Sequence, residues 1–301
     1  MMQMSIDIAW DDQRAFLAVL DGGSLSAAAR SLGWAQPTVR ARIEALEHAL
    51  ECVLFTRSPG GLTPTDQARV LGPHVRAMRF ASDAFRRAAS APPGEIAGTV
   101  RLAVSEFVGL EVLPPMLARL RAEHPGLAVE VDLSNASTDL MGQEADVAVR
   151  MYPPRQGALV ARKVGAVPLS FFANRDYAAR RGLPVNADEL AHHDLIGPDR
   201  ARADLALAEG IAPALSRERL VLRTDSHPAQ LAAVRAGLGI GVVQRPVGHA
   251  DPRLVPVLPD LIVAELGYWI VTHEDLRAVP RVRAAFDHLV EEFGDYTRAA
   301  E

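Results

Sequence analysis

The sequence has little of several features that mark particular protein classes. Its 301 residues contain one cysteine, Cys52, which excludes an intramolecular disulfide and any metal site that needs two thiolates. No apolar run is long enough to cross a bilayer, and the N-terminal residues lack the basic region and apolar stretch of a secretory signal. We therefore expect a cytoplasmic protein with no membrane partner. The net charge of −5 argues against indiscriminate coating of nucleic acid, but it allows a local basic surface.

Signatures of catalysis and of metal binding are also missing. The nine histidines show no metal-ligand spacing. Asp225, Ser226 and His227 are contiguous, so they cannot easily form a catalytic triad, and no G-x-S-x-G turn precedes them. The glycines 237, 239 and 241 follow a helical stretch and enter a strand, which is the reverse of the order in nucleotide-binding loops. We therefore expect no enzyme, no metal and no cofactor.

The residues that are present divide into three parts. A chain of 301 residues exceeds the usual size of a single core. Residues 1–64 carry short helical signals and a turn, residues 65–91 read as one helix, and the APPGE stretch at 91–95 breaks the pattern. Residues 92–301 alternate short buried strands with amphipathic helices, which predicts an α/β domain with a parallel sheet covered on both faces. The expected strands are 99–104, 127–133, 146–150, 167–173, 239–243 and 268–272, and the expected helices are 113–124, 229–237 and 280–293.

The first part contains two helices joined by a tight turn. Ser26 is a good N-cap for the helix that ends at Leu32, and Gly33 suits the left-handed residue that closes it. The next helix begins near Ala35 or Gln36. Pro37 fits its first turn, because the backbone N–H that proline lacks has no partner inside a helix at that position.

Polar side chains cluster at the start of this second helix. Gln can pair with adenine, Arg with guanine or phosphate, and the Thr methyl with a thymine methyl. In a helix-turn-helix these N-terminal residues meet the base edges, whereas a plain helical hairpin with solvated arginines is the alternative. A following β-hairpin near 54–68 could form a wing whose arginine reaches a phosphate, although an ordinary surface turn would look similar. The candidate DNA contacts are Ser26, Gln36, Pro37, Thr38, Arg40, Arg42 and Arg57.

Together these residues resemble the LysR-type transcriptional regulators. The likeness spans most of residues 10–68 and continues more weakly through the rest of the chain. Its N-terminal part is carried by Phe16, Leu17, Leu20, Gly23-Ser24-Leu25-Ser26-x-Ala28-Ala29, Leu32-Gly33, Gln36-Pro37-x-Val39, Ile43-x-x-Leu46-Glu47, Leu54-Phe55-x-Arg57 and Leu62-Thr63. Its later part is carried by Leu113-Pro114, His124-Pro125, Asp146 to Arg150, and Ala236 to Gly241.

The resemblance implies a winged helix-turn-helix, a dimerising linker helix and a two-lobed effector domain similar to periplasmic binding proteins. It also implies a homodimer or homotetramer whose hold on DNA changes when a small molecule binds. Three positions depart from the family pattern. Ala35 replaces a capping Ser, which costs about 1 kcal/mol of helix stability. Arg40 replaces a small hydroxyl residue and puts the usual base contacts in doubt, and Asp66 replaces a Gly.

The predicted linker helix carries an apolar seam with alternating steps of three and four. A seam of this kind favours pairing with a second copy, whereas packing on the chain's own effector domain is the alternative. Gly72 and Pro73 interrupt it, so we expect a kink or a late helix start there. The seam comprises Ala68, Leu71, Val75, Met78, Ser82, Phe85 and Ala89.

In the third part, polar residues follow four strands. We expect lobe I to comprise residues 97–167 and 268–293, and lobe II residues 168–267. A ligand between the lobes would meet the carboxyl ends of the strands and the N-termini of helices. Helix caps are the alternative for each Ser and Asn alone, and the set leaves open an organic acid or an amino acid as ligand. The candidate effector residues are Ser105, Glu106, Ser134, Asn135, Arg150, Asp225, Ser226 and His227.

These expectations lead to a sequence-specific regulator of transcription that responds to a small effector. The alternative is a solute-binding protein or an enzyme on the same two-lobed fold, with the N-terminal helices used only for assembly. The lack of a secretory signal counts against the solute-binding protein, and the lack of a catalytic constellation counts against the enzyme.

Overall fold

The structure is a computed structural model that describes residues 8–58, 61–88, 95–135, 145–153, 159–211 and 215–299. The chain divides into two compact units, and the first of them ends at Ala88. No described helix is both long and apolar enough to span a membrane. Ala89 of the predicted seam and positions 91–94 of the predicted break lie outside the described residues.

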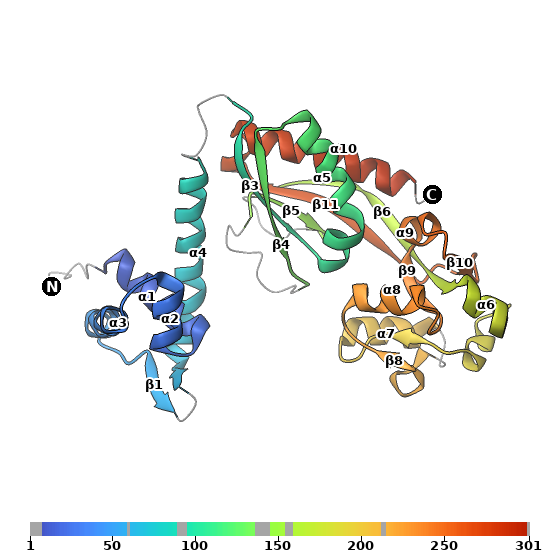
Figure 1. The fold of residues 1–301 in the computed structure, drawn as a ribbon, viewed down its shortest axis with the longest axis horizontal. Helices are drawn as coiled ribbons and strands as arrows, with labels where there is room; N and C mark the ends of the chain where they lie inside the picture. The colour runs from blue at the N-terminus through green and yellow to red at the C-terminus, as the bar shows by residue number, and fades with distance from the viewer. Residues whose placement is uncertain are drawn as a thin grey trace. The chain divides into compact units, whose positions relative to one another are not determined.

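Three helices, a hairpin and a long helix form the first unit (Figure 1). Their bounds are α1 Trp10–Gly22, α2 Leu25–Leu32, α3 Gln36–Leu50, β1 Phe55–Ser58, β2 Gly61–Pro64 and α4 Asp66–Ala88. Gly33 has a φ of 68° and closes α2, as its place after Leu32 predicts. The prediction that Ser26 caps α2 is wrong. Ser24 is the N-cap, and its hydroxyl accepts the Ala27 N–H at 3.1 Å, because α2 begins at Leu25, two residues earlier than a Ser26 cap would give.

The core of this unit consists of apolar residues spaced to face inward. On α3 they are Val39, Ile43 and Leu46, each at most 6% exposed. They pack with the α1 and α2 side chains and with Leu54 at the start of the hairpin. α3 therefore starts after Ala35, with Pro37 in its first turn as predicted. Its apolar residues, spaced three and four apart, form one buried stripe.

The long helix α4 runs without a break through Pro73. It starts at Asp66, where the Thr65 hydroxyl accepts the Ala68 N–H at 3.3 Å, so the expectation of a late start after the proline is wrong. Gly72 is buried against α1, where an added Cβ would lie 2.7 Å from Leu20 Cδ2. A glycine at this position lets the two helices approach closely.

The predicted seam of α4 divides into two halves with different surroundings. Ala68, Leu71 and Val75 pack into the core of their own unit. Met78 and Phe85 are 46% and 74% exposed. The interpretation of the whole seam as a surface for another copy is therefore wrong for its first half, because these three residues already have partners within the unit.

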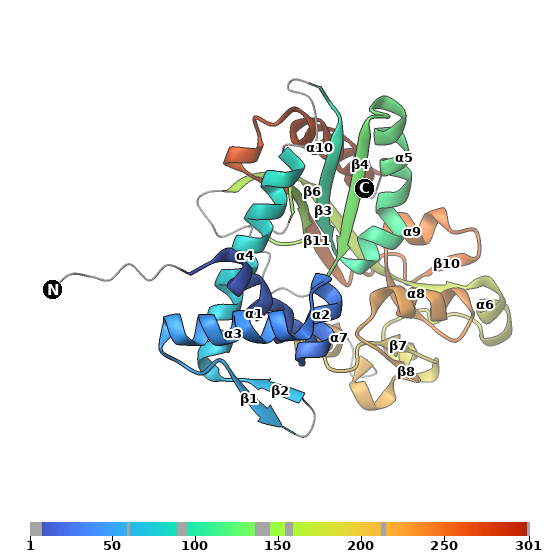
Figure 2. The same cartoon turned by 60° about the vertical axis from the view of Figure 1, so that its left-hand side comes forward.

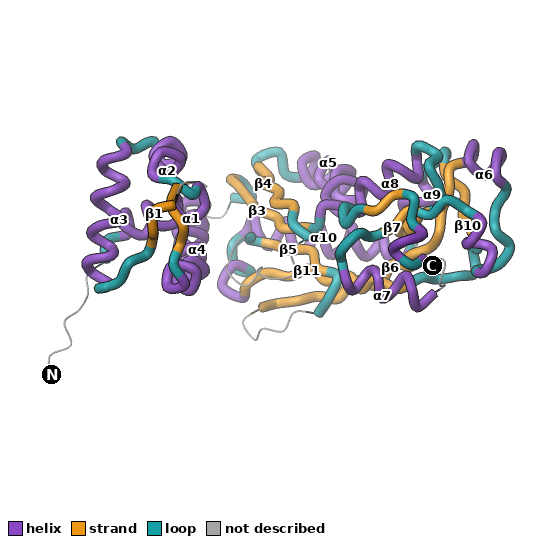
Figure 3. The backbone as a smooth tube through the Cα atoms, turned by 90° about the horizontal axis from the view of Figure 1, so that it is seen from below, coloured by secondary structure: helices purple, strands orange, loops and turns teal. Residues whose placement is uncertain are grey.

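The second unit is built on a seven-stranded sheet with the order β10-β6-β11-β5-β3-β4, in which β9 also pairs with β6 (Figure 3). The strands are β3 Gly98–Val104, β4 Leu127–Leu133, β5 Val147–Arg150, β6 Leu159–Asn174, β9 Gly241–Gln244, β10 Leu254–Val257 and β11 Ala264–His273. The pairs of β3 with β4 and with β5 are parallel. The pairs that involve β6 or β11 are antiparallel. The prediction of a parallel sheet therefore holds only for β3, β4 and β5 and is wrong for the rest of the sheet. The sheet is mixed because β6 enters one lobe and β11 returns from it beside β6.

Helices and a small second sheet complete this unit (Figures 1 and 2). The helices are η1 Val108–Val112, α5 Leu113–Glu123, α6 Arg175–Arg181, η2 Asp188–His192, α7 Arg202–Ile211, η4 Arg217–Arg219, α8 His227–Arg235, α9 Arg245–Ala250, η5 Glu274–Leu276 and α10 Pro280–Arg298. The parallel pair is β7 Ile196–Gly197 with β8 Leu222–Arg223. α5 and α10 belong to a cluster that fills lobe I and continues into lobe II, where it includes Leu231 and Val234 of α8. A separate cluster around Phe171, Tyr177 and Leu190 fills the rest of lobe II.

The crossover strand β6 is longer than the sequence pattern predicted. Residues 159–166 extend it because they pair with β11 along its length, whereas only 167–173 form an apolar run. A register shift occurs in this pairing between Tyr268 and Trp269. At that shift Gly165 has a φ of 149°, and an added Cβ would lie 2.3 Å from Thr297 Oγ1. The close approach lets the Thr297 hydroxyl donate to the Val164 carbonyl at 2.9 Å and fixes the end of α10 on the strand.

Candidate nucleic-acid interface and effector site

The start of α3 presents polar side chains above an apolar stripe. Gln36, Thr38 and Arg40 are exposed, while Val39 between them is fully buried. The N-cap is Ala35, and it makes no side-chain hydrogen bond to the helix. The first backbone N–H groups of α3 are therefore left for another acceptor, which a phosphate can supply.

Arg42 differs from the other candidates on this helix. Its guanidinium forms an ion pair with Asp12 of α1 at 3.2 Å, and that carboxylate side chain is 11% exposed. Arg14 of α1 makes a second contact, because its guanidinium lies 5.0 Å from the centre of the Trp34 ring in the α2–α3 turn. These two contacts hold α1 against the start of α3 and so fix the orientation of the polar residues at its tip.

The predicted wing is present as an antiparallel pair, β1 with β2, in which Arg57 stands opposite Leu62. Arg57 is exposed. The Leu62 N–H donates to the Gly23 carbonyl at 2.8 Å, which ties the wing to the α1–α2 turn. Gly61 has a φ of 127°, and an added Cβ would lie 2.6 Å from the same carbonyl oxygen, so only glycine fits there.

The sequence reasoning missed the residue that joins the wing to α3. The Glu47 carboxylate accepts the Leu54 N–H at 2.7 Å and the Phe55 N–H at 3.2 Å. An ionised acceptor on two backbone donors is stronger than a neutral one. The only signal was Glu47's place in the motif, because its partners lie seven and eight residues ahead and across a turn.

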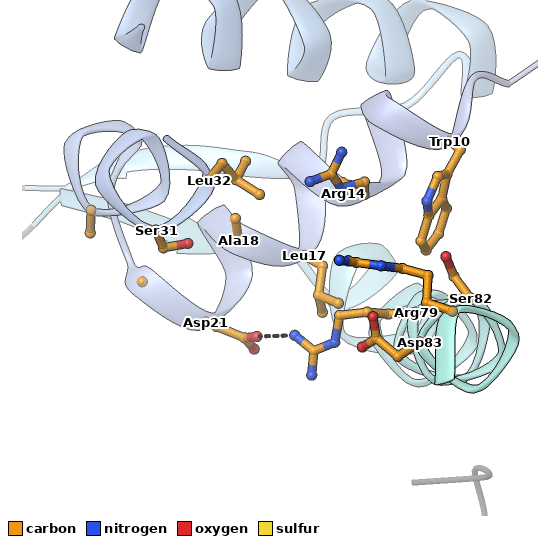
Figure 4. Close-up of a pocket in the computed structure, with 13 residues that line it drawn as sticks. Trp10, Arg14, Leu17, Ala18, Asp21, Ser31, Leu32, Arg79, Ser82 and Asp83 are labelled. Atoms are coloured by element: carbon orange, nitrogen blue, oxygen red, sulfur yellow. Dashed lines mark ion pairs between the residues drawn. The ribbon is translucent and has the colours of Figure 1, made fainter. Parts of the chain in front are cut away.

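A cavity of about 660 Å³ lies in the same unit between α1, α2 and α4 (Figure 4). Charged side chains of both signs line it, among them Arg14, Asp21, Arg79, Asp83 and Arg86. Asp21 pairs with Arg79 at 3.7 Å and with Arg76. Because both signs are present, the cavity does not favour a ligand of one charge.

Four candidate effector residues meet at the ends of β3 and β4 in lobe I. Asn135 accepts the Glu106 N–H at 3.1 Å and donates its amide to the Glu106 carboxylate at 3.1 Å. The Ser105 hydroxyl accepts the Val108 N–H at 3.4 Å, and the Ser134 N–H donates to the Val104 carbonyl at 3.0 Å. The structure therefore brings these four residues together, as parallel neighbours predict, and ties them to each other and to the start of η1.

Three more candidates lie in lobe II at the start of α8. The Asp225 carboxylate accepts the backbone N–H groups of residues 199, 200 and 201 at 2.8 to 3.0 Å. These bonds hold its pKa below the usual range, with the Arg200 N–H as the largest cause. Asp225 thus stabilises the turn that leads into α7. His227 pairs with Asp204 at 3.2 Å, and not with Ser226 or Asp225 as a triad would need.

Arg150, the last candidate, ends β5 and stands opposite Trp269 of β11. Trp269 in turn stands opposite Lys163 of β6, whose ammonium lies 5.6 Å from the indole ring centre. Residues directly opposite in a sheet project on the same side, so one tryptophan lies between two cations.

Comparison with known proteins gives matches along nearly the whole chain. Residues 10–69 match the bacterial regulatory helix-turn-helix protein domain of the lysR family, and residues 93–294 match the LysR substrate binding domain. A transcriptional regulator of Xanthomonas campestris is 32% identical over 61% of this chain, although the match spans only 53% of that relative. The activator AaeR of Escherichia coli is 27% identical over 76% of this chain and 74% of its own length.

Solved structures of full-length regulators share the fold. The Vibrio cholerae virulence activator AphB, with 22% identity, superposes with a TM-score of 0.61 over 94% of this chain and 99% of its own. CbnR in complex with its target DNA, with 19% identity, superposes with a TM-score of 0.64 over the same shares of the two chains. The helix-turn-helix with its wing, the two-lobed domain and these matches make the chain a transcriptional regulator rather than an enzyme, and it belongs to the LysR-type transcriptional regulator family.

Proposed function

We propose that the protein recognises a specific operator through the tip of α3 and the wing. The observation that carries this proposal is the exposure of Gln36, Thr38 and Arg40 at a helix start that lacks a side-chain cap. The three side chains can meet base edges in the major groove, and Arg57 can reach a flanking phosphate. Ser26 in the first turn of α2 and Pro37 at the tip of α3 contact the sugar-phosphate backbone of the DNA in this proposal. Arg42 positions α3 through its ion pair with Asp12.

Arg40 is the residue on which this proposal makes the sharpest prediction. If Arg40 reads a base, Arg40→Ala lowers affinity for the operator well beyond its effect on random duplex, by about 1–3 kcal/mol of discrimination. If Arg40 holds a phosphate, both affinities fall alike. Binding to the gene's own promoter region and to random DNA of equal length is measured at one salt concentration, because both affinities depend on salt.

The matched control is Arg283→Ala, which removes an exposed arginine from α10 in lobe I. This variant is expected to bind both DNAs like the wild type. A wild-type protein with equal affinity for promoter and random duplex contradicts the proposal of operator recognition.

We further propose that a small carboxylate or amino acid binds between the lobes and shifts the regulator between two states. The support is two clusters of polar residues, one at the ends of β3 and β4 and one at the start of α8, together with Arg150. Of these, Arg150 and the N-terminus of α8 favour a carboxylate. Glu106, whose carboxylate accepts the Asn135 amide through Oε2, favours an additional amine. Ligand binding changes the populations of lobe arrangements and thereby the spacing of the DNA-binding units in a dimer or tetramer.

Thermal unfolding tests the effector proposal with mono- and dicarboxylates and with single amino acids as probes. A probe at one hundred times its Kd adds about 2.7 kcal/mol to the free energy of unfolding. The same probe is expected to stabilise Arg150→Gln much less. Equal stabilisation of both proteins contradicts the placing of the carboxylate at Arg150.

A further inference from the structure

Three charged residues that belong to neither candidate site meet at the end of α8. The Arg235 guanidinium donates to both carboxylate oxygens of Glu111, with Nη1 to Oε1 at 2.8 Å and Nη2 to Oε2 at 2.7 Å. Its Nε donates to Asp251 at 2.8 Å. A two-pronged arginine–carboxylate pair fixes direction as well as distance. Arg235 is thus held on three of its donor positions.

The partners of this arginine come from different lobes. Glu111 lies in η1, which follows β3 and leads into α5, so it belongs to lobe I. Arg235 ends α8 and Asp251 follows α9, so both belong to lobe II. Figures 1 and 2 show α8 close to the beginning of α5 in both views. The Glu111–Arg235 pair therefore joins the two lobes through charged side chains. It adds to the strands β6 and β11 that cross between the lobes and to the apolar cluster that both lobes share.

The lobe II side of the pair is built to hold Arg235 in place. Asp251 is 8% exposed, and it also accepts two bonds from the Arg253 guanidinium at 2.7 and 2.9 Å. These bonds, with those from Arg235, hold the pKa of Asp251 far below its usual range, so this carboxylate stays ionised. The Asn174 amide donates to the Arg235 carbonyl at 2.7 Å and fixes the backbone. Arg235 is therefore oriented by lobe II, and Glu111 of lobe I completes its ion pairs.

The surroundings distinguish this pair from an ordinary surface ion pair. The Arg235 and Glu111 side chains are 23% and 18% exposed, whereas both side chains of the Arg283–Asp287 pair on α10 are more than 60% exposed. Loss of one partner from a half-buried pair leaves the other charge poorly solvated. Loss of an ion pair within one rigid body would change only the free energy of unfolding. Loss of a pair between lobes also changes the angle that the two lobes favour.

The helix α8 connects this pair to the candidate effector site. It begins at His227, next to Ser226, and ends at Arg235, about 12 Å away at 1.5 Å per residue. A single helix of this length moves as a rigid rod. A ligand that draws the start of α8 toward lobe I must therefore move Arg235 relative to Glu111 or be resisted by their contact.

We infer that Glu111 and Arg235 form a latch between the lobes that holds the ligand-free arrangement, and that α8 transmits ligand binding to this latch. The latch itself requires only the two lobes. Its role in the response to a ligand rests on the proposed function. Removal of the Glu111 charge frees the lobes on this side, while the Arg235–Asp251–Arg253 group stays intact within lobe II.

Distances between spin labels in the full-length protein test the latch. The labels are attached to cysteines introduced at Ala122 on α5 and Ala179 on α6, both exposed and one in each lobe, in a Cys52→Ser background. Labelled protein is diluted with unlabelled protein so that only distances within one chain are seen. Glu111→Gln and Arg235→Gln are expected to broaden the distance distribution and shift its mean. Distributions identical to the parent in both variants would overturn the latch.

The matched control is Arg253→Ala, which removes an arginine from the same group but leaves both bonds of the latch. This variant is expected to keep the parent distribution, and a shift as large as that of Glu111→Gln contradicts the specific role of Glu111. Near-ultraviolet circular dichroism establishes that each variant is folded. If Arg235→Gln does not fold, Arg235→Lys keeps the charge with a single contact and is expected to give an intermediate distribution, so an unchanged one counts against the latch.

Binding to the promoter fragment without added ligand separates this inference from the proposed function. If the latch sets the regulator's state, Glu111→Gln gives a footprint on the promoter that differs in length from that of the wild type. A changed distance distribution with an unchanged footprint overturns the claim that the latch sets the regulator's state. A protein that binds no promoter specifically fails the proposed function, while the distance measurement still decides the latch.

Discussion

At the scale of single residues, the hydrogen-bond partners of several side chains identify roles that the residue type alone does not predict. Asp225 is a clear case, because a carboxylate after a strand can bind a ligand or cap a turn. In the structure it accepts three backbone N–H groups just before α7. Glu47 is another, since it holds the first residues of the wing from the last turns of α3.

Asp225 leads to a prediction about pH. Its pKa is lowered in the folded protein, so its charge contributes stability at pH values above the ordinary aspartate pKa of about 3.9. That contribution is lost as the pH falls from about 4 through the lowered pKa. Asp225→Asn keeps a hydrogen-bond acceptor but loses the charge near the start of α7, which is expected to lower the free energy of unfolding at pH 7 by about 0.3–1 kcal/mol.

Urea unfolding of both proteins at pH 7, 5 and 3, followed by circular dichroism, measures this difference. It should be present at pH 7 and 5 and much smaller at pH 3. The exposed Asp260→Asn serves as control and should show little difference at any pH. A difference between wild type and Asp225→Asn that grows as the pH falls contradicts the assigned role.

At the scale of elements, the wing shows how two glycines in different segments depend on each other. Gly61 approaches the Gly23 carbonyl so closely that a Cβ would lie 2.6 Å from its oxygen, and its φ of 127° disfavours any side chain. The Leu62 N–H bond to the same carbonyl depends on this approach. The hairpin is therefore held at a fixed angle to the helices that carry the proposed DNA contacts.

Gly61→Ala is expected to push the wing away from the α1–α2 turn. The strain and the lost hydrogen bond should lower the free energy of unfolding by about 1–3 kcal/mol, and operator affinity should fall because Arg57 is displaced. Gly210→Ala in α7 is the matched control, since its Cβ meets nothing within 4 Å and alanine favours a helix. Affinity is measured by titration of labelled promoter DNA. Unchanged affinity and stability in Gly61→Ala would show that the wing is not held by this contact.

At the scale of the whole molecule, the outer half of the α4 seam is a candidate surface for assembly. Phe85 is 74% exposed and Met78 46% exposed, whereas the first half of the seam is covered by its own unit. Exposed large apolar side chains at seam spacing favour a partner helix. A dimer or tetramer joined through this half of α4 follows from the proposed function.

Phe85→Glu is expected to weaken that assembly, because it places a charge in an apolar contact. Sedimentation over a range of protein concentrations should show the variant dissociating at concentrations at least tenfold above those of the wild type. Val185→Glu in lobe II, where the valine is 80% exposed, controls for the added charge and should assemble normally. Assembly of Phe85→Glu equal to that of the wild type contradicts the role of this surface.

Much of the fold could be predicted because it depends on local patterns. Pro37 and the stripe of Val39, Ile43 and Leu46 place α3 without reference to the rest of the chain. The strands over 99–104, 127–133 and 268–272 follow apolar runs and are present in β3, β4 and β11. β4 is not the buried strand that the pattern predicts, since Val131 and Leu133 are 40% and 41% exposed. Local chemistry misplaced the cap of α2, since Ser24 and Ser26 are equally good caps and the backbone path chooses between them.

The tertiary structure decided whatever depends on residues far apart in the sequence. β6 is sixteen residues long because β11 pairs with a polar half that has no strand pattern of its own. The first half of the α4 seam is covered by α1 and its neighbours, which a heptad pattern cannot reveal. The Glu111–Arg235 contact spans 124 positions, and neither residue carries any local signal of it. The sequence by itself determined which runs of the chain become helices and strands and which DNA-binding motif the first of them form. Pairing, burial and charge contacts between distant segments arose only on folding, because they depend on distance in space rather than on spacing along the chain.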